Sequence, residues 1–206
     1  MGAGTTQPVR IAPSADRVAA AALAARSMND NPLHVAALGP DPDRRVAVMD
    51  QAFRALLTAP SREVLGAWVG DRLVGVAAHT SSRYCQPGLG GLLRFLPAAV
   101  HAGRSAPRML RWLRAWGRHD PGAPHSHLGP VAVTAAVRGQ GVGGALLTRY
   151  VALLDDRGAA GYLETDRPAN VRFYRRFGFE VLAEAEVLGV PNWFMLRSAA
   201  SGGGRG

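Results

Sequence analysis

The sequence predicts a mixed α/β domain of the α+β kind, and three observations predict it. Strand-like and helical stretches alternate along the chain, and two β-rich stretches are separated only by Gly70-Asp71-Arg72, as in an antiparallel hairpin. A later strand runs through a glycine-rich turn directly into a helix. The 206 residues, 48% of them hydrophobic, can bury one core. We expect one domain over 1–198, with an insertion at about 81–124 and a disordered tail at 199–206.

The first elements follow from local patterns. An apolar run at 9–12 predicts a strand, and Pro13-Ser14 before an alanine-rich stretch predicts a helix that reaches Arg26. Residues 29–42 are rich in Asn, Pro, Gly and Asp, which is typical of a connection. The next helix, 43–57, is predicted by the helical spacing of Val46, Met49, Phe53 and Leu56.

The remaining elements continue the alternation. Gly158 ends one helix, Pro168 begins another, and Gly178 breaks the latter before two closing strands. The predicted strands are 64–69, 73–80, 127–133, 162–165, 179–187 and 193–197, and the predicted helices are 141–157 and 168–177.

The charge composition limits the classes of function. The net charge is +9, but all 24 basic residues are Arg and none is Lys. This resembles the coding bias of a GC-rich genome, so the basic character is weak evidence for nucleic acid. The absence of Lys excludes Schiff-base and Walker-type lysine chemistry. The lone Cys85 excludes an intrachain disulfide and a cysteine-based zinc cluster, and an inert thiol is the favoured interpretation.

Much of the excess charge lies in the insertion. No acidic residue occurs between Asp71 and Asp120, an interval that holds eight Arg. On a helix over 104–118, five Arg face one side, and Met109, Trp112, Leu113 and Trp116 face the other. We favour a packed Trp face with a solvated Arg face. A lid over a substrate site and a membrane or nucleic-acid surface stay open as alternatives, and an exposed apolar face would favour a homodimer.

The segment from Val131 to Gly144 carries the most chemistry. A strand enters a glycine-rich turn and then a helix, so free backbone N–H groups converge where the helix dipole is positive. Such a turn can bind a diphosphate, and Arg138 adds charge beside it. A Rossmann fingerprint and a Walker loop both need patterns that the chain lacks.

Here the sequence resembles the GNAT superfamily of N-acetyltransferases. Arg138, Gly141 and Gly143 fill the family's [Q/R]-x-x-G-x-[G/A] pattern, and Asn170 to Tyr174 with Gly178-Phe179 match N-x-x-F-Y…G-F. The resemblance covers roughly 125–197. Its L-E-T…N-x-x-F-Y segment is similar to a bacterial branch that includes puromycin N-acetyltransferase.

The resemblance implies a mixed, mostly antiparallel sheet of six to seven strands, flanked by helices and splayed between strands four and five. It also implies acetyl-CoA as co-substrate, with the pantetheine arm in the gap between these strands. The residues that it assigns to cofactor binding are Val131, Ala132, Val133, Arg138, Gly139, Gln140, Gly141, Val142, Gly143, Gly144, Asn170 and Tyr174.

The resemblance implies direct attack of an amine on the thioester, with Tyr174 as general acid for the departing thiolate. Glu164, His127, His125 and bulk water stay open as routes for the amine proton. His79 and Trp193 are candidates for the acceptor side, although core packing explains both. We expect no metal, because no carboxylate accompanies the pair His125 and His127 in sequence.

The sequence therefore predicts an enzyme that transfers the acetyl group of acetyl-CoA to a primary amine of a small molecule. An Arg-rich lid would disfavour a strongly cationic acceptor. Two other classes remain: a non-catalytic acyl-CoA sensor or partner module, and a basic membrane or nucleic-acid binder. We expect no nucleic-acid partner, no membrane span and a cytoplasmic location, since no apolar run is long enough to span a bilayer and the first residues lack a signal pattern.

Overall fold

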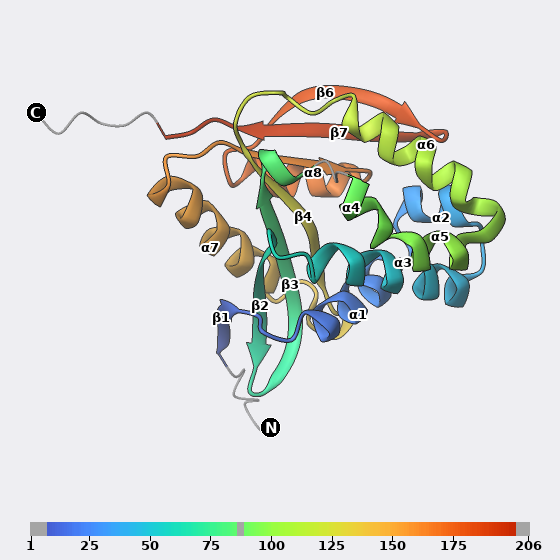
Figure 1. Ribbon diagram of the computed structural model, residues 1–206. Helices are drawn as coiled ribbons and strands as arrows, with labels where there is room; N and C mark the ends of the chain where they lie inside the picture. The colour runs from blue at the N-terminus through green and yellow to red at the C-terminus, as the bar shows by residue number, and fades with distance from the viewer. Residues whose placement is uncertain (1–7, 86–88, 201–206) are drawn as a thin grey trace, which may run out of the picture.

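A seven-stranded sheet forms the centre of the computed structural model, which describes residues 8–85 and 89–200 (Figure 1). The strand order is β1-β2-β3-β4-β5-β7-β6, and β4 and β5 form the parallel pair in an otherwise antiparallel sheet. This confirms the predicted mixed sheet and its central hairpin. The strands are β1 (Val9–Pro13), β2 (Glu63–Val69), β3 (Arg72–Ser81), β4 (Ser126–Val133), β5 (Gly161–Thr165), β6 (Glu180–Val187) and β7 (Val190–Arg197).

Helices cover both faces of the sheet. In Figure 1, α7 lies on one side of the central strands, and α1 and α3 lie on the other. The α-helices are α1 (Arg17–Ser27), α2 (Pro32–Leu38), α3 (Pro42–Leu57), α4 (Leu89–Leu93), α5 (Leu96–Ala102), α6 (Ala106–Gly117), α7 (Val142–Asp156) and α8 (Pro168–Arg175). Short 3₁₀ segments are η1 (Ser82–Tyr84), η2 (Gly103–Ser105) and η3 (Ala135–Val137). None of the helices in the described part of the chain is both long and apolar enough for a transmembrane segment.

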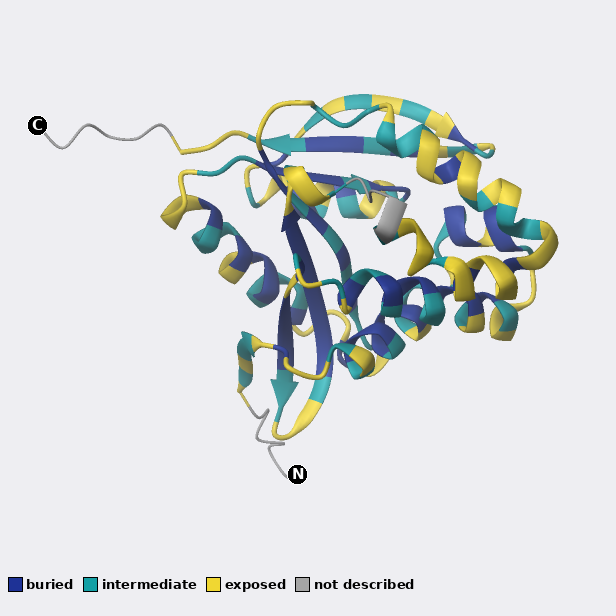
Figure 2. Cartoon of the chain, in the orientation of Figure 1, coloured by how far each residue is buried: buried dark blue, intermediate teal, exposed yellow. Residues whose placement is uncertain are grey.

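Two hydrophobic cores result from the alternation of side chains along the central strands. Val64 and Val76 point into the core beneath α1 to α3 and α6. Their neighbours Leu65 and Ala77 point into the other core, beneath α7 and α8. Figure 2 shows these strands buried, whereas α5 and α6 carry exposed outer faces. The sheet therefore separates two hydrophobic cores, and helices from distant parts of the chain pack against its two faces.

The prediction that 29–42 is a connection was wrong for its centre. Helix α2 fills that segment, with Pro32 at its start and Gly39, at φ 93°, directly after its end. The helix has only seven residues, which is too few for a clear helical period. Its stability comes from tertiary packing, because Leu33, Ala37 and Leu38 are buried.

The insertion at 81–124 holds three α-helices, and the third, α6, corresponds to the helix predicted over 104–118, whereas α4 and α5 were not predicted. Arg104 lies in η2 rather than in the basic helix, and η2 separates α5 from α6. The predicted two faces of α6 are confirmed for Trp112, which is buried, and for Arg108, Arg111 and Arg114, which are exposed. Leu113 was predicted on the packed face but is 53% exposed. Of the predicted tail, residues 201–206 lie outside the described residues.

The strands β4 and β5 separate soon after they meet. Within the described residues, their pairing consists of Ser126 with Gly161 and His127 with Tyr162. Beyond His127, β4 continues to Val133 against β3 but without β5 on its other side. This is the splay that the family resemblance implied, and it leaves backbone groups of β4 open toward a gap.

We expect Gly161→Ala to destabilise the fold by about 1 to 3 kcal/mol, because it overpacks the point where β5 joins β4. An added Cβ would lie 2.7 Å from Leu154 Cδ1 and 3.0 Å from Phe179 Cζ. Urea unfolding followed by tryptophan fluorescence measures the effect. Gly144→Ala is the control, since its Cβ meets nothing within 4 Å and alanine favours a helix. Equal stability of the two variants would contradict this packing.

Candidate active site

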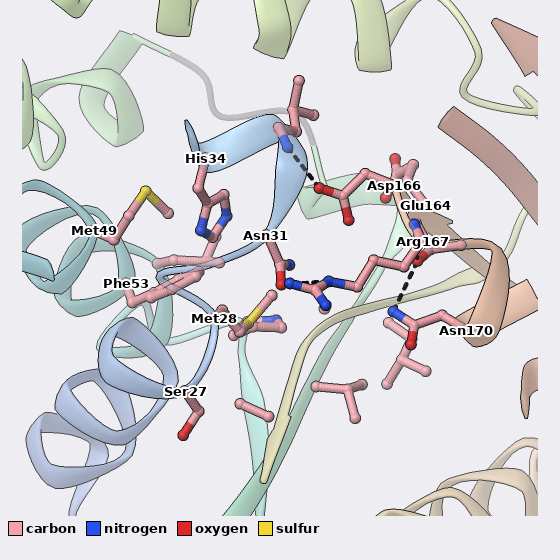
Figure 3. A pocket seen from close by; sticks show the side chains of 18 of the residues that line it. Ser27, Met28, Asn31, His34, Met49, Phe53, Glu164, Asp166, Arg167 and Asn170 are labelled. Carbon is pink, nitrogen blue, oxygen red and sulfur yellow. Dashed lines mark hydrogen bonds between the residues drawn. The ribbon is translucent and has the colours of Figure 1, made fainter. Parts of the chain in front are cut away.

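A cavity of about 450 Å³ occupies the gap between the splayed strands. Its floor is β4 from His127 to Val133, and the end of β5 with the two residues after it, from Glu164 to Arg167, forms one wall. The end of α1, the start of α2 and the inner face of α3 form the opposite wall, as Figure 3 shows for Ser27, Asn31 and Phe53. Segments that are remote from one another in the sequence therefore meet in one pocket.

Half of the residues predicted to bind the cofactor line this pocket. They are Val131, Ala132, Val133, Arg138, Asn170 and Tyr174. Asn170 Nδ2 donates a hydrogen bond of 3.0 Å to Thr165 Oγ1, which orients the amide at the pocket wall (Figure 3). The other six form the turn and the first residues of α7, outside the pocket lining: Gly139, Gln140, Gly141, Val142, Gly143 and Gly144.

The glycine-rich turn leaves the N-terminus of α7 open. Gly139 and Gly141 have φ of 79° and 82°, a conformation that favours glycine. The cap residue of α7 is Gly141, and no side chain in the described part of the chain caps its first turn. The N–H groups there are those that bind anions at other helix N-termini. A Cβ at Gly143 would touch the Phe173 ring at 3.5 Å, so α8 closes one side of the turn.

Arg138 connects the turn to α1. Its Nε donates to the carbonyl of Val133 at 3.3 Å, and its Nη2 donates to the carbonyl of Ser27. The guanidinium is thus held across the mouth of the pocket while its residue remains exposed. In this position it supplies positive charge between the pocket and the N-terminus of α7.

Tyr174 is buried at the pocket wall, with 8% of its surface exposed. Its ring packs against Phe173 and Phe179, both edge-on. Burial, with the Asp166 carboxylate nearby, raises the pKa of Tyr174 above its ordinary value. The hydroxyl therefore keeps its proton at neutral pH and can donate it.

His127 and Glu164 form a close pair across the two strands that separate here. His127 Nε2 lies 2.8 Å from Glu164 Oε2, and the Glu164 side chain is only 4% exposed. Burial disfavours the charge on His127, but the Glu164 carboxylate and the neighbouring Cys85 side chain together outweigh this effect and raise the pKa of His127 to about 10. At neutral pH the ring is therefore charged and donates its Nε2–H to Glu164.

The family of the chain follows from its sequence over this region. The sequence model of the Acetyltransferase (GNAT) family matches residues 33–179, which is well over half of the chain. The chain belongs to the GNAT acetyltransferase family. Its acyltransferase class follows from this membership.

Solved structures of GNAT proteins share the fold. One is a Corynebacterium glutamicum protein described as histone acetyltransferase HPA2 and related acetyltransferase. It has a TM-score of 0.68 at 22% identity, and the match covers 95% of this chain and 99% of that chain. The acetyltransferase yncA from Salmonella typhimurium, solved with acetyl-CoA, has a TM-score of 0.53 at 17% identity, covering 97% and 99%. FeeM, an N-acyl amino acid synthase from uncultured soil microbes, has a TM-score of 0.54 at 17% identity, covering 93% and 90%.

Three other candidates of the sequence analysis lie outside the pocket lining of this GNAT protein. His79 is 2% exposed and packs against the Tyr150 ring, and Trp193 packs in the core beneath α7 and α8. His125 is buried beside His127, where its Nδ1 donates to the carbonyl of Ala123 at 2.8 Å. Core packing accounts for the positions of His79 and Trp193. His127 lines the pocket, whereas His125 beside it does not.

Sequence reasoning missed several charged residues of the pocket. Asp166 Oδ2 accepts the backbone N–H of Leu33 at 2.8 Å, and Arg167 Nε donates to Asn31 Oδ1 at 3.2 Å (Figure 3). These bonds tie the end of β5 to α2. Arg62 is 7% exposed, and burial lowers its pKa to about 10. The position of Asp166 and Arg167 directly after the fifth strand could have indicated that they lie at the pocket. No sequence pattern marked Arg62 as a pocket residue.

The basic helix α6 roofs the pocket. Trp112, Leu113 and Trp116 line the cavity, while the Arg face points outward. Trp116 Nε1 donates a hydrogen bond of 3.0 Å to Asn192 Oδ1 on β7, a residue that is 1% exposed. The packed face of α6 thus also borders the cavity, and the interpretation of α6 as a lid over a substrate site stays a prediction.

We expect Trp116→Phe to destabilise the protein by about 1 to 3 kcal/mol, because it leaves the buried Asn192 oxygen without its donor. For a chain of this size, 1 kcal/mol corresponds to roughly 2 to 4 °C in Tm, measured by calorimetry. Trp68→Phe on β2, outside the pocket lining, is the matched control. If the Tm falls no further for Trp116→Phe than for Trp68→Phe, the hydrogen bond from Trp116 to Asn192 does not stabilise the packing of α6 on the sheet.

Proposed function

We propose that this protein is an N-acetyltransferase that transfers the acetyl group of acetyl-CoA to a primary amine of a small molecule by direct attack. The observation that carries the proposal is the pocket at the splay, which joins the open edge of β4 to Tyr174 and to the pair of Glu164 and His127. The open N-terminus of α7, which would bind the diphosphate, follows β4 after η3 and the glycine-rich turn. Donor and acceptor machinery thus meet at one place.

The donor half of the site uses backbone groups. Beyond His127, β4 lacks β5 as a partner, so backbone groups of Val131 and Val133 can pair with the amide-bearing pantetheine arm. The diphosphate would bind the N–H groups at the start of α7, with Arg138 adding a cation. Asn170 at the pocket wall would contact the pantetheine side.

The acceptor half supplies the proton transfers. Glu164 attracts the amine and takes up its proton, and His127 orients the Glu164 carboxylate through the Nε2–H bond. Tyr174 donates a proton to the departing thiolate, which its protonated, buried hydroxyl suits. Direct attack needs no covalent enzyme intermediate.

The lining of the acceptor half suggests the class of amine. Met49, Phe53, Trp112 and Trp116 give it an apolar side, and the buried cation Arg62 adds positive charge. An amine that also carries a carboxylate or an apolar group would be accommodated there. The N-acyl amino acid synthase among the similar folds supports an acceptor of the amino-acid type. A likeness to the puromycin N-acetyltransferase branch rests on the L-E-T…N-x-x-F-Y segment.

The test is release of free thiol from acetyl-CoA across a panel of amino-acid derivatives, aromatic amines and polyamines. Longer acyl-CoA donors run in parallel, and calorimetry measures binding of each donor to the same preparation. We expect turnover with amino-acid or aromatic amines. Donor binding without turnover would indicate the sensor function, and no donor binding would overturn the proposal.

We expect Tyr174→Phe to lower turnover at least about tenfold, because removal of a general acid typically costs 10²- to 10⁴-fold. The affinity for acetyl-CoA should change little, since the ring remains. Tyr150→Phe is the control: it removes a buried hydroxyl that donates to the Ser126 carbonyl, outside the pocket lining. Unchanged turnover of Tyr174→Phe where chemistry limits the rate would exclude the role.

We expect Gly141→Val to weaken acetyl-CoA binding, because a side chain at φ 82° distorts the turn that presents the N–H groups of α7. Gly158→Val, at φ 57° beyond the other end of α7, imposes similar strain away from the turn. Calorimetry should show a loss of affinity for the first variant alone. Equal affinities would contradict the placement of the diphosphate.

A further inference from the structure

Four side chains of residue types that commonly bind metal ions lie close together where the insertion joins the sheet. Cys85, Asp120, His125 and His127 each offer one ligand atom, and these four atoms lie within 4.8 Å of one another. Cys85 Sγ is 3.1 Å from Asp120 Oδ2, which is 3.8 Å from His125 Nε2. The sequence analysis expected no metal, because no cluster of carboxylates lies beside the two histidines in sequence. Cys85 is remote from them along the chain and comes close only in the folded protein.

The protonation of His125 follows from its hydrogen bond. Its Nδ1 lies 2.8 Å from the carbonyl of Ala123, which can only accept, so Nδ1 carries the proton. In a neutral ring, Nε2 is then a bare lone pair. It is buried, has no hydrogen-bond partner among the described residues, and belongs to a side chain that is only 1% exposed. A buried acceptor of this kind needs a cation or a donor.

His127 repeats this pattern on its other nitrogen. Its Nε2 donates to the Glu164 carboxylate, which leaves Nδ1 buried and also without a partner in the described part of the chain. The cluster thus collects two buried imidazole nitrogens without hydrogen-bond partners in the described part of the chain, a carboxylate and a sulfur. Zinc binding would displace the proton that His127 Nδ1 carries when the ring is charged.

The geometry points to a zinc site formed by Cys85 Sγ, an Asp120 carboxylate oxygen, His125 Nε2 and His127 Nδ1. Tetrahedral zinc with bonds of about 2.0 to 2.3 Å places its ligand atoms about 3.3 to 3.8 Å apart. Asp120 Oδ2 lies 3.1 Å from Cys85 Sγ and 3.8 Å from His125 Nε2, and all four ligand atoms lie within 4.8 Å of one another, so small side-chain shifts would complete the site. Sulfur and nitrogen ligands favour zinc over magnesium or calcium, which take oxygen. A thiolate and a carboxylate balance the charge of the divalent ion.

Besides Cys85, each proposed ligand residue has a hydrogen-bond partner outside the site that orients it, as in metal sites generally. His125 is held by Ala123, His127 by Glu164, and Asp120 Oδ1 accepts the N–H of Gly122 at 2.9 Å. Binding would release the thiol proton and any proton on His127 Nδ1 to solvent, with no change of oxidation state.

The site would fasten the roof of the pocket to the sheet. Cys85 lies just after η1 at the start of the insertion, and Asp120 follows α6 at its end. Both histidines lie at the beginning of β4, so one ion would clamp the two ends of the insertion to the splay. It would also fix the His127 ring that faces Glu164.

The test uses the full chain without a histidine tag, stripped with a chelator and titrated with Co²⁺ and then Zn²⁺. Because Cys85 is the only cysteine, a thiolate-to-cobalt charge-transfer band reports on this site alone. We expect the band to saturate at one cobalt per chain and to disappear when zinc is added. No band, or binding without stoichiometry, would overturn the proposal.

Variants separate the site from surface binding. Cys85→Ser should remove the band, and His125→Ala should lower metal affinity by more than about 100-fold, beyond the 10- to 100-fold cost of losing an outer partner. His101→Ala changes an exposed histidine of the same insertion and should bind as the unmodified chain does. Equal affinity of all three variants would contradict the ligand set. The readout is metal binding, so it is independent of acetyl transfer.

Discussion

The brief pairing of β4 with β5 is the constraint on which the site depends. Two residue pairs join these strands, and then β5 turns away while β4 continues against β3. The unpaired edge of β4 supplies the floor of the pocket, and its continuation carries the glycine-rich turn. Everything assigned to chemistry lies within a few residues of this divergence: His127 at its start, Glu164 opposite, and Tyr174 on the helix that follows β5.

Much of the sheet was predictable because its signals are local. The hairpin, the strand that leads into the glycine-rich turn, and the N-x-x-F-Y helix depend on spacing within about ten residues. Helix α2 was missed because seven residues show no clear period and Leu33 and Leu38 are stabilised by packing. In the insertion, the helix predicted over 104–118 is present as α6, whereas α4 and α5 were missed because each is too short to show a clear period.

The site was predictable where a motif marks it and not where tertiary contacts make it. Val131 to Val133, Asn170 and Tyr174 were found by pattern, and all line the pocket. Arg62 and the contact of Cys85 with Asp120 depend on chain segments that meet only in the folded protein. The bond between His127 and Glu164 likewise follows from strand register, which changes how both residues act.

The residues that line the pocket come from two parts of the chain. The inner face of α6, with Trp112 and Trp116, belongs to the insertion, whereas the β4 edge and the α7 turn belong to the common framework. Changes on the inner face of α6 can therefore reshape one side of the cavity while the β4 edge and the α7 turn stay as they are. The outward arginines of α6 are outside this constraint, because they do not line the cavity. One wall of the pocket is thus built by a segment that the central sheet does not need for its strand pairing.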